Sequence, residues 1–194
     1  MAETFNYPGS NYTKDAFTSA LRFAFANVAN FPDYKYTDKE ATSKVQIFKE
    51  FPRRIFRPPT IVVRAGASDS SLASLGDQEY TRIASATNPV DQFGGKMTVP
   101  IIISIHALTT TDREKLTDLT AFFIRHLFRA KFAELGIVYT KIATVGEGQF
   151  EWDNQIVYTN GVTVDTYQEY TAEIPVALTD MIGSFEVTMI GDCC

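Results

Sequence analysis

The side chains that most often perform chemistry are few in this chain and are not arranged in a catalytic pattern. Its two histidines, His106 and His126, have no Cys, Asp or Glu neighbours at metal-ligand spacing. The chain has no G-x-S-x-G elbow, no phosphate-binding glycine loop and no dinucleotide fingerprint. Glu169 and Glu173 could share one face of a strand, but no recognised pocket accompanies them. We therefore expect no enzyme activity, no metal site and no cofactor.

The most basic stretch is FPRRIFRPP, which carries Arg53, Arg54 and Arg57 among aromatic and proline residues. Guanidinium groups bind carboxylates and phosphates in a fork, so this composition is typical of a loop that docks on an acidic partner. The plainer alternative is a hairpin connection whose arginines pair with acids of the same subunit. Direct contact with DNA is a third, weaker reading, because three arginines do not make a DNA site.

Acids gather in GEGQFEWD, where Glu147, Glu151 and Asp153 surround Trp152. The segment is either a solvated acidic hairpin or, through its tryptophan, a contact with another subunit. The net charge of −5 argues against a surface that grips nucleic acid as a whole.

The two cysteines, Cys193 and Cys194, are adjacent at the end of the sequence. A disulfide between adjacent residues is strained and closes no loop, so these thiols do not staple the fold. They are either exposed thiols on a flexible tail, residues 191–194, or a crosslink between subunits in an oxidising environment.

Composition sets broader bounds. With 194 residues, 45% of them apolar and 21% charged, the chain can bury a substantial core as one domain, and no apolar run is long enough to span a bilayer. The N-terminus lacks the basic and apolar regions of a signal peptide, so we expect residence in a reducing cytoplasm.

The elements that must position these residues centre on a strand and a helix. The run MTVPIIISIHA, residues 97–107, alternates, which predicts a strand with Val99, Ile101, Ile103 and Ile105 on its core face. Thr111 is the expected cap of a helix over 111–135, with Glu114 completing a capping box and Gly136 ending the helix. Its predicted apolar stripe, which further phenylalanines widen, holds Leu116, Leu119, Phe123 and Leu127.

The remaining elements follow from similar patterns. An arm over 1–12 precedes a helix over 13–30 that Thr13 caps. We expect strands over 44–51 and 59–65, a long loop over 66–79, and later strands over 155–158 and 162–175 joined by a turn at Asn160-Gly161. The prediction is a single α+β domain, residues 1–194, with a mixed or antiparallel sheet packed by two main helices and with long loops and terminal arms.

The order of these elements resembles that of the tail terminator and tail completion proteins of long-tailed bacteriophages. The likeness comprises a leading helix, a strand pair, a long loop, the strand ending in IIISIHA, the helix at TTDREKLTDL and later strands such as residues 168–176. It covers roughly three quarters of the chain as a pattern of elements.

This resemblance implies a structural virion protein in the tail or neck, assembled in the host cytoplasm. The implied assembly is a ring, expected to be hexameric, that closes the tail tube beneath the head. Its implied partners are further copies of itself, the tail tube protein and a head connector or stopper protein, with the tail sheath as a further candidate and no membrane. DNA would pass without specific binding, and Glu147, Glu151 and Asp153 could line the lumen and repel it.

Two alternatives stay open. A connector, stopper or baseplate protein of the same virion fits the same pattern. A small-molecule or peptide binding module would instead use the apolar sheet face and the Arg53 to Arg57 loop, and would be a monomer or dimer with a pocket.

Overall fold

The computed structural model describes residues 10–39, 41–52, 57–67, 80–83 and 90–175, with the backbone alone for residues 80–83, 90–96 and 169–175. Contacts divide the chain into two compact units. One comprises Met1–Tyr7, Leu72–Lys96 and Glu169–Cys194, and the other comprises Pro8–Ser71 and Met97–Gln168. The single domain over 1–194 and the tail at 191–194 stay predictions. The predicted arm over 1–12 was wrong at residues 10–12, which belong to helix α1, and its residues 1–9 lie outside the described residues.

The first unit contributes described residues to three strands. Strand β3 (Tyr80–Ile83) pairs antiparallel with the beginning of β4 (Val90–Ala107), from Tyr80 opposite Phe93 to Ile83 opposite Val90. The end of β6 (Gln155–Pro175) also belongs to this unit.

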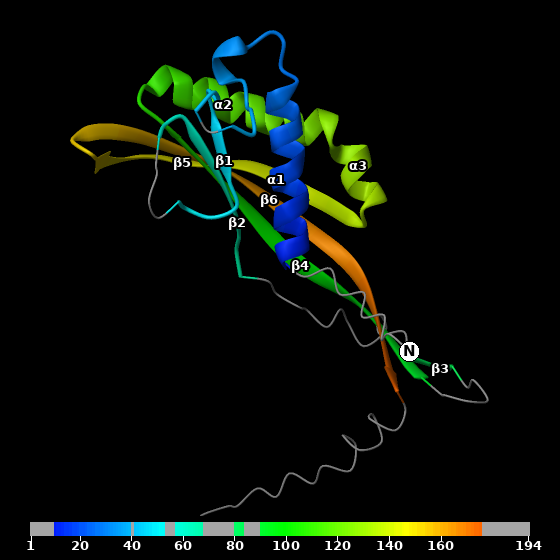
Figure 1. The fold of residues 1–194 in the computed structure, drawn as a ribbon. Helices are drawn as coiled ribbons and strands as arrows, with labels where there is room; N and C mark the ends of the chain where they lie inside the picture. The colour runs from blue at the N-terminus through cyan, green and yellow to red at the C-terminus, as the bar shows by residue number, and fades with distance from the viewer. Residues whose placement is uncertain (1–9, 40, 53–56, 68–79, 84–89, 176–194) are drawn as a thin grey trace, which may run out of the picture. The chain divides into compact units, whose positions relative to one another are not determined.

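The strands form one mixed sheet in the order β1-β2-β4-β6-β5, with β3 paired to β4 beside this path (Figure 1). The outer strands are β1 (Gln46–Phe48) and β5 (Ile137–Trp152), and β2 (Thr60–Ala65) lies between β1 and β4. This arrangement confirms the predicted α+β class.

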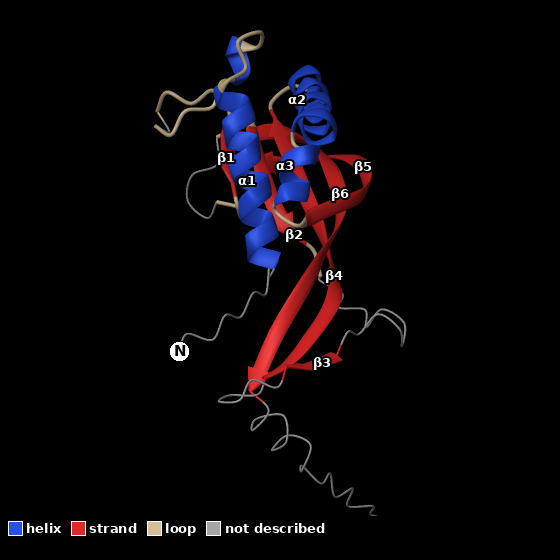
Figure 2. Cartoon of the chain, turned by 90° about the vertical axis from the view of Figure 1, so that its right-hand side faces the viewer, coloured by secondary structure: helices blue, strands red, loops and turns tan. Residues whose placement is uncertain are grey.

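The core of the second unit lies between this sheet and its helices. Helices α1 (Ser10–Ala26), α2 (Thr110–Phe122) and α3 (Arg129–Glu134) cover one face of the sheet (Figure 2). Against them the predicted core face of β4 is buried completely, which confirms the period-two prediction: Val99, Ile101, Ile103 and Ile105. Phe17 of α1 stacks on Phe132 of α3 with ring centroids 4.4 Å apart, so the helices also pack on each other.

Helix α1 begins at Ser10 and ends at Ala26, not at 13 and 30 as predicted. Thr13 is therefore not a cap. It lies buried within the helix, where its hydroxyl accepts a hydrogen bond from the side-chain amide of Gln168 on β6. This buried polar contact satisfies a hydroxyl that the sequence pattern assigned to a helix end.

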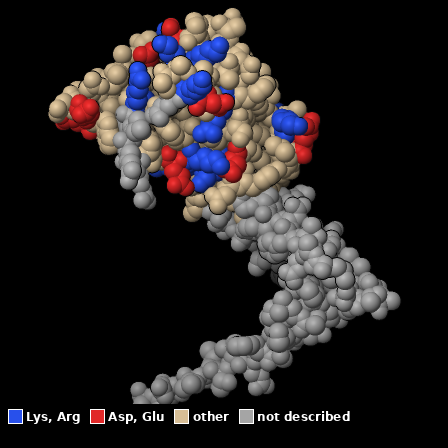
Figure 3. Space-filling view, viewed as in Figure 1, with Lys and Arg blue, Asp and Glu red and all other residues tan. Residues whose placement is uncertain are grey.

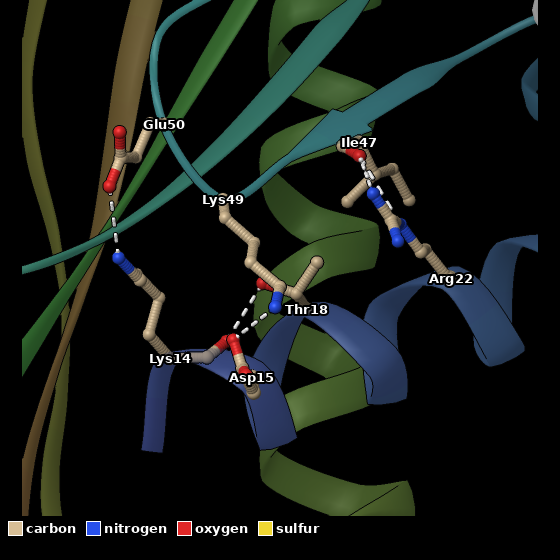
Figure 4. Close-up of polar contacts among 7 residues, drawn as sticks. All are labelled: Lys14, Asp15, Thr18, Arg22, Ile47, Lys49 and Glu50. Carbon is tan, nitrogen blue, oxygen red and sulfur yellow. Dashed lines mark hydrogen bonds and ion pairs between the residues drawn. The ribbon is translucent and has the colours of Figure 1, made fainter. Parts of the chain in front are cut away.

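Polar contacts hold the short strand β1 to α1 (Figure 4). Arg22 donates a 2.8 Å hydrogen bond from Nη2 to the carbonyl oxygen of Ile47. Two ion pairs flank it: Lys14 with Glu50 at 3.2 Å, and Lys49 with Asp15 at 2.5 Å. Because each ion pair has an exposed partner, we assign each less than about 1 kcal/mol.

Strands β1 and β2 are parallel, with Gln46 opposite Thr60 and Phe48 opposite Val62. The connection between them is therefore not the hairpin that one reading of the arginine loop required. A parallel pair needs a crossover connection and cannot be joined by a tight turn.

The helix predicted over 111–135 consists of three elements, α2, a π-helical turn and α3, and it begins earlier than expected. Its cap is Thr109, whose hydroxyl accepts a 3.1 Å hydrogen bond from the backbone N–H of Asp112. The Asp112 carboxylate accepts hydrogen bonds from Thr109 at 2.7 Å and from the Tyr34 hydroxyl at 2.6 Å. The expected roles of Thr111 and Glu114 were wrong, because the cap lies two residues before Thr111.

A turn of π-helix, η2 (Phe123–Leu127), interrupts the helix between α2 and α3. The backbone N–H of Phe128 donates to the carbonyl of Phe123, 3.2 Å away and five residues earlier. This extra residue in the turn moves the buried stripe forward by one position. Phe128 is buried and Leu127 is 56% exposed, so the predicted stripe is confirmed at Leu116 and Phe123 and was wrong at Leu127.

Strands β5 and β6 form a long antiparallel hairpin. Its turn is Asp153-Asn154, both with positive φ (50° and 58°), as a two-residue turn requires. The predicted turn at Asn160-Gly161 was wrong, since Gly161 lies within β6 opposite Val145. Gly136, with φ of 72°, ends the helix as predicted.

The corrected cap gives a matched test. Thr109→Ala should lower the free energy of unfolding by about 1 kcal/mol, because it leaves the first-turn N–H of Asp112 without its acceptor. Thr111→Ala, at an exposed position inside the helix, should change it by less than about 0.5 kcal/mol. Urea denaturation followed by circular dichroism measures both, and a larger loss for Thr111→Ala would contradict this assignment.

Candidate assembly surfaces

An aromatic cluster joins the two segments that the sequence analysis singled out. Phe51, which precedes the arginine loop, has its ring 6.4 Å from that of Trp152 in the acidic hairpin, centroid to centroid. His106 lies between the segments, 5.6 Å from the Phe51 ring and 5.7 Å from the ring of Phe150. Phe51, where the arginine loop begins, therefore lies beside the tip of the β5–β6 hairpin.

His106 belongs to β4 but alternates with the residues that face the helices. Its side chain is buried, with 6% of its surface exposed. Burial lowers its pKa to about 4, and the positive charge of Arg64 on β2 contributes to the shift. The imidazole is therefore neutral at pH 7, and it packs as one of the rings of the cluster.

The arginine loop is described only in part. Arg53 and Arg54 lie outside the described residues. Arg57 is exposed and borders a polar cleft of about 320 Å³, together with Lys44 and Asp33. The cleft therefore has both cations and an acid at its edge, and the docking of an acidic partner stays a prediction.

The acidic residues of the hairpin differ in their surroundings. Glu147 lies at an irregularity in the β5–β6 register and forms a 3.0 Å ion pair with Arg113 of α2. The Arg113 side chain is only 5% exposed and also contacts Glu114 at 3.1 Å. Glu147 therefore compensates a buried charge and holds the hairpin to the helix layer.

Glu151 and Asp153 are exposed, and among the described residues we find no ion pair to either. Trp152 is 38% exposed beside them. An exposed tryptophan beside exposed acids is compatible with the predicted contact between subunits. That these acids line a lumen stays a prediction. Cys193 and Cys194 lie outside the described residues, so their crosslink stays a prediction too.

The outer edge of β5 is the longest sheet edge that the described residues leave open. Strand β5 pairs with β6 on one side, and no other described strand pairs with it. Val138 and Val145 on this strand are 37% and 47% exposed. An open edge of this kind presents unpaired N–H and C=O groups that can pair with another chain.

A second surface is an apolar hollow of about 520 Å³ beside the C-terminal end of α1 and η2. Four of its side chains are well exposed: Phe23 (67%), Phe31 (42%), Phe122 (52%) and Leu127 (56%). We call this surface the apolar hollow. Figure 3 shows that Lys and Arg side chains alternate with Asp and Glu side chains on the face that carries α1 and β1.

Neither the hollow nor the packing role of His106 was predicted from the sequence. The adjacent pairs Phe122-Phe123 and Leu127-Phe128 are a signal for the hollow, because neighbouring residues on a helix cannot both face one core. The position of His106 had no such signal, since its aromatic neighbours come from segments distant in sequence.

Among the described residues, no group of three or more His, Cys, Asp or Glu side chains is placed to hold a metal ion. Within the same residues, no helix has the length and apolar character needed to cross a membrane. Searches with models of known families and against curated protein sequences found no match to this chain.

The buried neutral histidine predicts a pH effect. The unfolded histidine binds a proton near pH 6.5 and the folded one only near pH 4, so the unfolded chain binds more protons between these values. The His106 contribution should lower the free energy of unfolding by about 2 kcal/mol from pH 7 to pH 5. Urea denaturation of His106→Phe should lack this decrease, while His126→Phe, at an exposed site, should keep it. An unchanged pH dependence in His106→Phe would refute a buried neutral imidazole.

The acids of the hairpin give a second matched pair. Glu147→Gln should lower the free energy of unfolding by about 1 kcal/mol, because it removes one of the two carboxylates that compensate Arg113. Glu151→Gln, also exposed on β5, should change it by less than about 0.3 kcal/mol. Thermal and urea denaturation at low salt measure both. Equal effects would mean that Glu147 is an ordinary surface acid.

Proposed function

We propose that this chain is a structural virion protein that forms a ring closing the end of a phage tail tube and joining it to the head connector. The observation that carries the proposal is that one compact unit has two different surfaces suited to contact between subunits. These are the open edge of β5 and the apolar hollow. The order of elements that resembles the tail terminator proteins supplies the kind of assembly.

Two unlike surfaces favour a ring over a symmetric dimer. In a head-to-tail contact, one surface of each copy meets a different surface of the next, and a suitable rotation closes the ring. Closure leaves no β5 edge free to continue pairing, so assembly stops at a defined size. The mechanism is geometric, and no residue performs chemistry in it.

The aromatic cluster gives the proposed ring a place to contact other virion proteins. It places Phe51, the first residue of the arginine loop, beside Trp152 of the acidic hairpin. We propose that the cations of the loop and the acids of the hairpin share one surface, where mixed charge would favour orientation of a partner and rejection of wrong ones. We assign this surface to the connector or stopper, with Arg53, Arg54 and Arg57 as its cations.

The alternative function, a small-molecule or peptide binding module, has one observation in its favour. The cleft beside Arg57, Lys44 and Asp33 is polar and about 320 Å³ in volume. This lies at the lower end of the range for ligand sites. A binding module would be a monomer or dimer, so the two functions predict different masses.

The first test is the mass of the purified protein by light scattering coupled to size exclusion, followed by negative-stain imaging. A ring of about six copies of this 21.7 kDa chain would have a mass of about 130 kDa. Because a ring can also assemble only on its tube, binding to purified tail tubes of the phage that encodes it is measured in parallel. A monomer that fails to bind these tubes would contradict the proposal and favour the binding module.

The edge contact has its own variants. Val138→Lys with Val145→Lys places two charges on β5 at exposed positions, and lysines on an edge strand oppose pairing with another chain. The matched control is Ile156→Lys, 55% exposed on β6. The paired variant should remain folded and lose the ring, while the control keeps it. A ring that survives in the paired variant would exclude the β5 edge as a subunit contact.

A further inference from the structure

The two outer strands of the sheet end it in opposite ways. Strand β5 has a long edge along which Val138 and Val145 are exposed. Strand β1 is also an end strand, since among the described strands only β2 pairs with it. Its residues Gln46 and Ile47, however, are only 6% and 2% exposed. The β1 edge is therefore covered within the subunit, and a covered edge is protected from pairing with another chain.

The hydrogen bonds of β1 show how its edge is covered. The backbone N–H of Gln46 donates to the carbonyl oxygen of Pro59 at 3.0 Å, so the peptide groups of Gln46 face β2. In such a pair the next residue, Ile47, presents its own N–H and carbonyl to the opposite side. The carbonyl oxygen of Ile47 accepts hydrogen bonds from Arg22 of α1, from Nε at 3.3 Å and from Nη2 at 2.8 Å. Arg22 thus occupies the acceptor that an added strand would use.

The surroundings of Arg22 hold it in this position. Its side chain is half-buried, and its guanidinium carbon lies 5.7 Å from the centre of the Tyr36 ring. Figure 4 shows that the side chain of Arg22 extends from α1 to Ile47. Two ion pairs from the same helix, made by Lys14 and Asp15, hold the residues that follow β1. Because hydrogen bonds from a charged donor are stronger than those between neutral groups, a backbone N–H of an incoming strand would not readily displace Arg22.

We propose that Arg22 closes the β1 edge and thereby restricts strand addition to β5. If both edges were open, β5 of one copy could pair with β1 of the next, and such head-to-tail contacts continue into fibres unless their rotation closes a ring. With β1 closed, copies cannot join into one continuous sheet through these two strands. Arg22 is therefore a residue that determines the specificity of assembly. The inference deepens the proposed ring and rests on it for the closed assembly whose growth Arg22 limits.

Opening the β1 edge tests this role. Arg22→Leu removes the donors but keeps aliphatic bulk. It should lower the concentration at which species larger than the wild-type assembly appear by at least about tenfold, measured by light scattering. Lys49→Ala removes an ion pair beside β1 but leaves the Ile47 carbonyl bonded, so it should not have this effect. Thr109→Ala, which weakens the fold away from β1, should not have it either.

The larger species must also use the β5 edge. Arg22→Leu combined with Val138→Lys and Val145→Lys should lose them, because lysines on an edge strand oppose pairing with another chain. The matched control combines Arg22→Leu with Ile156→Lys, an exposed position on β6, and should keep them. Larger species that persist with both edge lysines would overturn pairing between β1 and β5.

A peptide measures strand addition without any ring. The probe is a fluorescently labelled peptide with the sequence of residues 137–145, IVYTKIATV, and its anisotropy reports binding. In chains that carry Val138→Lys and Val145→Lys, Arg22→Leu should bind this peptide at least about tenfold more tightly than the chain that retains Arg22. A peptide of the same composition in scrambled order is the control. Equal binding with and without Arg22 would overturn the inference.

The outcomes separate this inference from the proposed function. A ring of unchanged mass in Arg22→Leu, with no gain in peptide binding, would overturn the closure of the β1 edge and leave the ring function standing. A wild-type monomer that does not bind tail tubes would contradict the tube-closing function, while the peptide measurement would still decide the role of Arg22. Larger species that form equally in Thr109→Ala would reflect a weakened fold and overturn the inference.

Discussion

The structure depends on the burial of one face of β4. Its four inward aliphatic side chains are fully covered by the helices, and each such burial contributes about 1.5 to 3 kcal/mol. Both β2 and β6 take their positions by pairing with this strand, and β5 and β1 follow from them. The helices must therefore lie on this face, and the other elements project from a sheet whose centre is fixed. The candidate assembly surfaces consist of the residues that this packing leaves exposed.

The sequence predicted the parts of the fold that follow from one-sided burial. The alternation in β4 and the glycine that ends the long helix were readable because each is encoded by neighbouring residues. The parallel pairing of β1 with β2 was not, since it depends on segments that meet only in the folded chain. At Asn160-Gly161 the local preference for a turn was overridden, because β6 continues there opposite Val145 of β5.

The candidate surfaces were predictable in composition but not in arrangement. The arginine loop and the acidic hairpin were recognised as separate segments from their charges. Nothing in the sequence indicated that Phe51 and Trp152 would meet beside His106, because the three residues are distant from one another in the chain. Glu147 was predicted as part of an acidic surface, but its ion pair with Arg113 gives it a structural role. Contacts between distant segments thus decide which charged residues are structural and which remain available.

The π-helical turn η2 affects how the exposed residues of the apolar hollow can change. By adding one residue to a turn, it shifts the phase of the helix, so that Phe128 points inward while Leu127 points outward. The outward aromatic and aliphatic residues are therefore released from the demands of core packing. Their identities can therefore change while the interior stays the same. A backbone irregularity of a single residue thus separates the evolution of the exposed apolar residues from the evolution of the core.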